Sequence, residues 1–206
     1  REVLCEEIGI DPAGEPTMRP AEIRAPVAEI ERAAEALAGA ARPLIVAQRG
    51  AGDRAGWDAL ARLAADWAIP VSDYWAVGNP IAQNHPSYVG ADVGPSLAEA
   101  DVILAIDSLA PWSPDAHPMR EGARVIHLGP DPLMARTPNR NFRADIALAT
   151  ETGPGLVALE AAMKPRLAKA AAGVAARRKD VEARAEAAQA AGRAAGELAE
   201  GQAMTK

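Results

Sequence analysis

The stretch PLIVAQRGAGDRAGWDAL, residues 43–60, joins an apolar run to an amphipathic segment through a loop with two glycines. Residues 43–47, PLIVA, are continuously apolar, which is typical of a short strand that is buried on both faces. Beyond the glycines, large apolar side chains recur at helical spacing, as Trp57, Leu60 and Trp67 show. The stretch therefore predicts a strand, a tight turn and a helix, which is the repeating unit of an open α/β fold.

The same alternation continues along residues 27–163. The predicted helices cover residues 26–40, 54–68, 95–100 and 153–163. The predicted strands cover residues 43–47, 69–75, 101–107, 123–129 and 144–150, and the predicted loops cover residues 78–90 and 108–122, the second with a possible short helix. Several strands are continuously apolar, which is typical of a parallel sheet covered on both faces. The sequence therefore predicts a three-layer α/β sandwich around an open, mainly parallel, Rossmann-like sheet.

The segments on either side of this body differ from it in composition. Residues 9–26 are rich in proline and glycine and predict a linker. The chain starts without an initiator methionine, as if within an element, so we expect it to be a piece of a longer polypeptide. Residues 164–206 are rich in alanine, arginine and glutamate, and they predict a solvated connector that is helical or partly disordered. The few large apolar residues of this connector hold no heptad register, and they are Leu167, Val174, Val181 and Leu198.

The composition excludes several classes of partner. The chain has 206 residues, of which 49% are hydrophobic, and its formal net charge is −6. Nucleic acids and anionic membranes bind surfaces with clustered lysine and arginine, so we expect neither as a partner. The one cysteine, Cys5, excludes an internal disulfide and a cysteine-cluster metal site. The sequence has neither a long apolar run nor a signal-peptide pattern, so we expect a cytoplasmic protein.

The glycine loop has two interpretations that the residues leave open. Residues 50–55, GAGDRA, satisfy the dinucleotide-binding pattern G-x-G-x-x-A between a strand and a helix. Asp73 follows Gly52 by 21 residues and lies near the end of the second predicted strand, where an acid would bind the ribose of NAD. In this interpretation, the chain is a stand-alone module that binds NAD or ADP through backbone N–H groups. In the other, the glycines only allow a tight turn from strand to helix.

Four motifs occur in order along the chain. They are PLIVAQRGAG at 43–52, NHPSYVG at 84–90, LAEADVILAID at 97–107 and ARVIHLGPDP at 123–132. Together they resemble the central domain of thiamine-diphosphate-dependent enzymes of the acetolactate synthase type. The opening REVL is also similar to the end of the pyrimidine-binding domain that precedes the central domain in this family. The resemblance covers about residues 1–163, with residues 1–26 as the end of the preceding domain and a linker.

The resemblance implies a six-stranded parallel sheet and a parent enzyme of three domains, in the order pyrimidine-binding, central and diphosphate-binding. The parent would be a transferase or decarboxylase that acts on 2-keto acids, as a homodimer or homotetramer. Thiamine diphosphate and Mg²⁺ would bind between the two outer domains. The chain has neither the catalytic glutamate nor the metal motif of the family, so we expect no catalytic and no metal-binding residue in it.

Some members of the family bind FAD or ADP in the central domain. The residues that match their nucleotide-binding positions are Arg49, Gly50, Ala51, Gly52, Asp107, Ser108, Gly129, Pro130 and Asp131. The chain departs from the family pattern at Asp107, which replaces a glycine, at Leu109, which replaces an arginine, and at Gly129, which replaces an aspartate. Because a carboxylate repels a pyrophosphate, a purely structural domain without a nucleotide is the alternative expectation.

Overall fold

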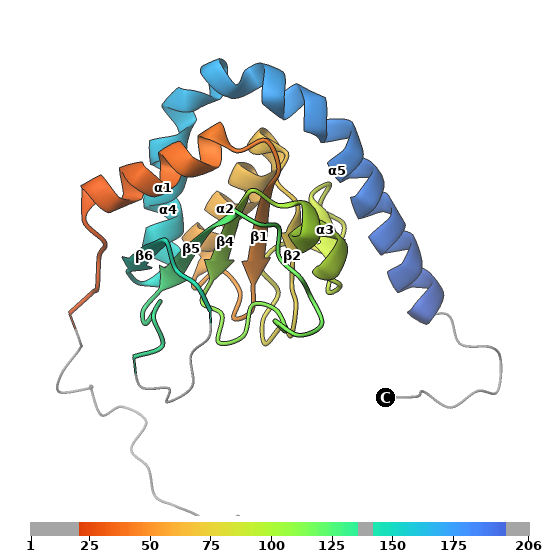
Figure 1. The fold of residues 1–206 in the computed structure, drawn as a ribbon, viewed down its shortest axis with the longest axis horizontal. Coiled ribbons are helices and arrows are strands. Elements are labelled where there is room, and N and C mark those ends of the chain that lie inside the picture. Colours follow the sequence, from red (N-terminus) through yellow and green to blue (C-terminus); the bar gives the residue numbers. More distant parts are fainter. Residues whose placement is uncertain (1–20, 136–141, 197–206) are drawn as a thin grey trace, which may run out of the picture.

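The computed structural model of the chain describes residues 21–135 and 142–196 (Figure 1). The strands are β1 (Pro43–Ala47), β2 (Val71–Ser72), β3 (Tyr88–Gly90), β4 (Val102–Ile106), β5 (Arg124–Gly129) and β6 (Ile146–Ala149). They form one six-stranded, all-parallel sheet in the order β3-β2-β1-β4-β5-β6. The predicted α/β fold with a Rossmann-like parallel sheet is therefore confirmed.

Two strands differ from the elements that the residue pattern predicts. β2 takes only two residues of the predicted strand 69–75, and the predicted loop 78–90 ends in β3. A strand of three residues is too short to show a periodic pattern. The residue pattern therefore predicts five strands. The structure has six, which is the number that the family resemblance implies.

The strand order places a topological switch point between β1 and β4. From β1 the chain builds outward to β2 and β3, and it then crosses back to form β4 on the other side of β1. Because the strands are parallel, the loops that follow β1, β4 and β5 lie together at the carboxyl edge of the sheet. In open α/β sheets, ligands bind at this edge beside the switch point.

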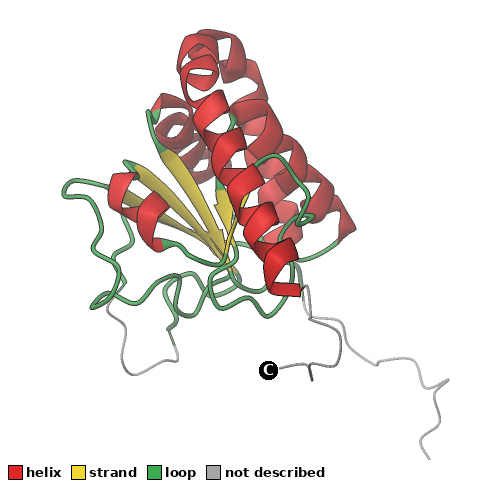
Figure 2. Cartoon of the chain, turned by 90° about the vertical axis from the view of Figure 1, so that its right-hand side faces the viewer, coloured by secondary structure: helices red, strands yellow, loops and turns green. Residues whose placement is uncertain are grey.

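Helices cover the two faces of the sheet unequally. The helices are α1 (Val27–Gly39), α2 (Arg54–Trp67), α3 (Gly94–Glu99), α4 (Thr152–Met163) and α5 (Leu167–Gly196). Ile45 of β1 packs in a core with α1, α2 and α4, whereas Leu44 points to the opposite face and packs in a smaller core with α3. The loop 108–122 completes this smaller layer, where the rings of Trp112 and Phe142 meet edge to face at 5.5 Å. Figure 2 shows the sheet between the thicker helical layer and the short helix α3.

The C-terminal helix α5 lies against the domain. It is a single helix of 30 residues that crosses the amino ends of the strands and then descends beside the β3 edge (Figure 1). Leu167, Val174 and Val181 follow one another at intervals of seven residues, and Val174 and Val181 are buried. The predicted helix is therefore confirmed, but these three residues do share a heptad register. The predicted solvation is wrong for this face of the helix.

Arginine side chains fasten α5 to the ends of two other helices. Arg177 donates from Nε and Nη2 to the carbonyl of Trp67, at 3.0 and 2.7 Å, and from Nη1 to the carbonyl of Ala40 at 3.1 Å. Arg178 Nη1 donates to the carbonyl of Ala65 at 3.0 Å. The carbonyls at the end of a helix lack partners within it and carry partial negative charge. Guanidinium groups thus hold α5 against the domain, although large apolar residues are scarce in this helix. Burial lowers the pKa of Arg177.

The lower part of α5 covers the open edge of the sheet. β3 is an edge strand, and a Cβ built on Gly90 would lie 3.6 Å from the Cβ of Ala188, so small residues allow close approach. Gln189 Nε2 donates to the carbonyl of His85 at 3.3 Å. A covered edge cannot pair with a strand of another chain, so α5 protects β3 from edge-to-edge association.

Candidate functional site

The residues predicted to hold a nucleotide lie at the carboxyl edge of the sheet, on both sides of the switch point. Residues 49–52 follow β1, residues 107–108 follow β4, and residues 129–131 end β5 and turn away from it. The backbone N of Asp107 donates to the carbonyl of Leu128 at 2.7 Å, so the segments after β4 and β5 are in contact. The structure therefore brings the three predicted segments together.

Arg49 is paired with a carboxylate of the neighbouring segment. Its Nη1 lies 3.1 Å from Asp107 Oδ1. Asp107 has a φ of 39°, in the left-handed region, at the position where the family pattern has glycine. Because both side chains are partly exposed, such a pair contributes at most about 1 kcal/mol to stability. Arg49, one of the residues predicted to hold a nucleotide, therefore has an anionic partner within the chain.

The glycines of the loop are in close contact with other parts of the chain. Gly50 and Gly52 have φ values of +80° and +83°, which residues with a side chain rarely adopt. A Cβ on Gly52 would lie 2.6 Å from the backbone N of Gly153 in α4, and one on Gly50 would lie 3.4 Å from the carbonyl of Asn79. A Cβ on Gly56 would lie 2.6 Å from the Cα of Gly153. The start of α4 and the loop after β2 therefore fill the space beside the glycine loop.

The start of α2 carries a negative charge from the chain itself. Asp53 is the N-cap of α2, and its Oδ1 accepts a hydrogen bond from the backbone N of Gly56 at 2.7 Å. The same carboxylate lies against Gly153, near the start of α4. In a dinucleotide-binding fold, the start of this helix faces the pyrophosphate. Asp53 thus occupies the helix end to which the sequence assigned a phosphate.

Asp73, the predicted ribose-binding acid of the NAD interpretation, is buried just beyond β2, with an exposed fraction of 6%. The hydroxyl of Tyr88 donates to Asp73 Oδ2 at 3.0 Å, and Asp73 Oδ1 has no hydrogen-bond partner among the described residues. Burial, followed by the negative charge of Asp73, raises the pKa of Tyr88 to about 12. The carboxylate therefore faces the interior of the protein.

Substitution of Tyr88 by phenylalanine is expected to lower the free energy of unfolding by about 1–2 kcal/mol, because a buried carboxylate loses its hydrogen bond. The pKa of Tyr88 is raised from 10.0 to about 12, so the phenol stabilises the fold below pH 10 and loses this contribution as the pH rises to about 12. Urea unfolding of both proteins at about pH 8 and about pH 11 measures this dependence. The difference should be smaller at the higher pH, and an equal difference at both would contradict the prediction.

The remaining predicted residues are engaged within their own turns. Ser108 is buried, and its hydroxyl donates to the carbonyl of the last residue of β4 at 2.9 Å. Ala51 is buried in the glycine loop, and Pro130 is exposed. Asp131 Oδ1 accepts a hydrogen bond from the backbone N of Ala135 at 2.9 Å. These residues shape the turns at the carboxyl edge.

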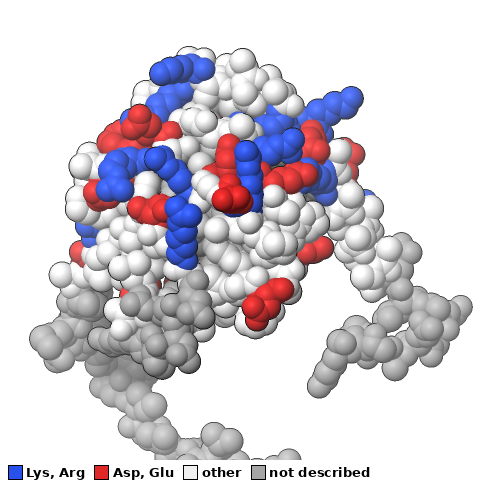
Figure 3. Space-filling view, viewed as in Figure 1, with Lys and Arg blue, Asp and Glu red and all other residues white. Residues whose placement is uncertain are grey.

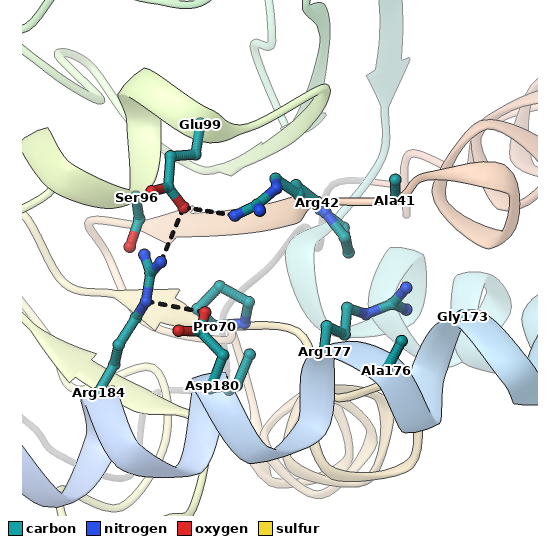
Figure 4. A pocket seen from close by; sticks show the side chains of 12 residues that line it. Ala41, Arg42, Pro70, Ser96, Glu99, Gly173, Ala176, Arg177, Asp180 and Arg184 are labelled. Carbon is teal, nitrogen blue, oxygen red and sulfur yellow. Dashed lines mark hydrogen bonds and ion pairs between the residues drawn. The ribbon is translucent and has the colours of Figure 1, made fainter.

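A hollow of about 550 Å³ lies at the opposite, amino edge of the sheet, between α5, α3 and the start of β1 (Figure 4). Glu99 accepts hydrogen bonds from Arg42 and Arg184 at 2.7 Å each, and Arg184 Nε lies 3.0 Å from Asp180 Oδ2. The hydrogen bond from Arg184 is the main cause that lowers the pKa of Glu99. This network ties α5 to α3. The sequence does not predict this network, because the charged residues of α5 have the pattern of a solvated surface.

The described part of the chain shows no feature of a metal site or a membrane span. Three other hollows lie among the described residues, and neither they nor the hollow at the amino edge are lined by a residue of the glycine loop. Within residues 21–135 and 142–196, no three His, Cys, Asp or Glu side chains gather closely enough to hold a metal ion. None of the helices there is both long and apolar enough to cross a lipid bilayer.

Comparison with protein families decides the relationship. Residues 30–159, more than half of the chain, match the family described as thiamine pyrophosphate enzyme, central domain. The chain belongs to this family. The match begins in α1 and ends in α4, so the central domain contains the whole sheet, and α5 lies outside the matched region.

Solved structures share the fold of the central domain. A protein from Mycobacterium smegmatis that is described as a thiamin diphosphate-dependent enzyme matches 73% of the chain, with a TM-score of 0.56 and 20% identity. Benzoylformate decarboxylase from Polynucleobacter necessarius matches 75% of the chain, with a TM-score of 0.58 and 16% identity. The matches cover only 31% and 30% of these two chains, and identities this low establish the fold alone. Comparison with curated proteins found no match.

Proposed function

We propose that this central domain is part of a longer thiamine-diphosphate-dependent enzyme of the acetolactate synthase type, which acts on 2-keto acids. The observation that carries the proposal is the family match across the whole sheet, in a chain that spans less than a third of two solved relatives. Pyrimidine-binding and diphosphate-binding domains flank it in the parent, which is a homodimer or homotetramer. The domain acts there as a rigid scaffold.

The catalytic cofactor is assigned to the flanking domains. Thiamine diphosphate supplies the electron sink for the decarboxylation of a 2-keto acid. The described residues of this chain do not fit it or its Mg²⁺, because no three metal-ligating side chains gather and the start of α2 is capped by Asp53. In this proposal the described residues take no part in catalysis, and their role is to hold the neighbouring domains in place.

A site for FAD or ADP at the carboxyl edge is the second candidate function, because the three predicted segments converge there. Two carboxylates oppose it, since Asp107 pairs with Arg49 and Asp53 caps α2, where phosphates would bind. An NAD-binding module is not favoured either, because Asp73 is buried against Tyr88. A structural domain without a bound nucleotide is the better account of these contacts.

The polypeptide that contains this chain is expected to consume a 2-keto acid such as pyruvate only when thiamine diphosphate and Mg²⁺ are added. The 206-residue chain alone should show no turnover, because its described residues hold neither component. Release of carbon dioxide and disappearance of the keto acid measure the reaction. A polypeptide that neither binds thiamine diphosphate nor consumes a 2-keto acid would contradict the proposed function.

The same preparation tests the nucleotide alternative. Calorimetric titration of the 206-residue chain with ADP and with FAD should show no saturation below about 1 mM, because Asp107 and Asp53 oppose the phosphates. A dissociation constant of about 1 mM corresponds to about 4 kcal/mol of binding free energy. Micromolar binding of either nucleotide would support the second candidate function. It would leave the assignment of catalysis to the flanking domains unchanged.

A further inference from the structure

Three large apolar side chains are exposed at the carboxyl edge of the sheet, in the loops that follow β2 and β4. They are Trp75, Val77 and Leu109, with exposed fractions of 65%, 78% and 45%, and we name them the Trp75 patch. Only 3% of the residues of this chain are aromatic, so a tryptophan left outside the core forgoes much of the burial available to it. Packing within the domain does not account for the patch.

One buried residue holds both loops of the Trp75 patch. Gln48 follows β1 with an exposed fraction of 6%, and its backbone carbonyl accepts a hydrogen bond from the N of Val77 at 2.7 Å. Its side-chain Oε1 accepts a hydrogen bond from the N of Leu109, also at 2.7 Å. The backbones of Val77 and Leu109 are therefore both fixed to Gln48, while their side chains are exposed. This arrangement makes the patch a defined surface.

Trp75 has a strained backbone and a supported ring. Its φ of 51° lies in the left-handed region, which residues with a Cβ avoid. The ring stacks on Tyr74 with centroids 5.5 Å apart and an interplanar angle of 8°, and Tyr74 meets His117 edge to face at 5.2 Å. Backbone strain of this kind costs about 1–3 kcal/mol and clusters at functional positions. An exposed tryptophan that is held in place is suited to anchor a protein interface.

The two edges of the sheet differ in what covers them. α5 crosses the amino edge, where Arg177 and Arg184 fasten it. In the described residues no helix crosses the carboxyl edge (Figure 1). Figure 3, in the same view, shows Lys, Arg, Asp and Glu gathered over the upper, helical part. At the carboxyl edge, the Arg49–Asp107 pair lies beside the patch. Exposed apolar side chains at an edge that no described helix covers are typical of a protein interface.

We propose that the Trp75 patch is the surface on which a flanking domain of the same polypeptide docks, and this inference rests on the proposed function. The matched region makes up 31% and 30% of two solved relatives, so most of such a polypeptide lies in other domains. A separate partner forms a stable interface with roughly 20–30 residues, many more than the patch contains. A domain joined through the chain has a high effective concentration and needs a smaller surface. The occupant is therefore an apolar face of a neighbouring domain, and not a second copy.

The test compares the reactivity of cysteines that replace two exposed valines, one at a time. Val77 lies in the patch and Val27 starts α1, with nearly equal exposed fractions of 78% and 76%. In a Cys5→Ser background, Val77→Cys and Val27→Cys each place one thiol in this chain. Maleimide labelling is followed by peptide mass spectrometry, in the 206-residue chain and in the full polypeptide. Relative to the isolated chain, labelling at position 77 should be about ten-fold slower or more in the full polypeptide, because a docked domain exposes the site only when it opens. Labelling at position 27 should slow by less than about two-fold.

Equal labelling rates at position 77 in the two proteins would overturn the docking proposal. Labelling of the isolated chain that slows as its concentration rises would also overturn it, because the occupant would then be a second copy. Thiamine diphosphate binding and turnover are measured separately. An active polypeptide with a reactive position 77 overturns the docking proposal alone. A protected position 77 in a polypeptide that does not bind thiamine diphosphate supports docking and overturns the proposed function alone.

Discussion

Replacing Gly52 with alanine is expected to lower the free energy of unfolding of the domain by about 3 kcal/mol or more, from backbone strain and overpacking together. The φ of Gly52 is +83°, which a residue with a Cβ adopts only under strain. The new Cβ would also lie 2.6 Å from the backbone N of Gly153, so the start of α4 would have to move away from the glycine loop. Urea unfolding followed by circular dichroism measures the loss, without any nucleotide present.

Gly192 is the matched control for this substitution. It lies within α5, and a Cβ built on it meets nothing within 4 Å. Gly192→Ala should therefore be neutral or stabilise the helix by up to about 1 kcal/mol, because alanine favours the helix over glycine. A Gly52→Ala protein as stable as the unmodified chain would show that the loop does not need glycine for packing, and it would favour the nucleotide-binding interpretation again.

Replacing Arg177 with alanine is expected to destabilise the docked state of α5 by about 2 kcal/mol, since charged hydrogen bonds to helix carbonyls are lost. The guanidinium holds the carbonyls of Trp67 and Ala40, so its removal frees the ends of α1 and α2 at the same time. Hydrogen exchange along α5 and urea unfolding measure the effect, and exchange should rise most near Val174 and Val181, which are buried in the docked helix. The edge strand β3 should lose protection as well, because α5 covers it.

Arg193→Ala provides the control on the same helix. Arg193 is exposed near the end of α5, so its substitution should change stability by no more than about 0.5 kcal/mol. Arg177→Lys should recover only part of the loss, because an ammonium cannot reproduce the planar set of guanidinium donors. Equal exchange in the Arg177→Ala and Arg193→Ala proteins would show that the apolar face alone docks α5.

The local elements of the fold were predictable, and some contacts of α5 were not. The run at residues 43–47 and the helix after the glycines have clear periodicity, and both form where the pattern predicts them. The seven-residue spacing of Leu167, Val174 and Val181 was a usable signal for a buried face. The partners of Arg177 carry no such signal, because they are backbone carbonyls, which every residue has.

By itself, the sequence determined the order of most elements, the α/β class and the resemblance to a family, because these depend on apolar spacing and on motifs within short windows. Only the tertiary structure decided what the glycine loop contacts. Gly52 lies against α4, and Arg49 pairs with Asp107 after β4, although both partners are distant in the chain. Such contacts depend on which segments the parallel topology places side by side, and a local pattern of residues does not contain that information.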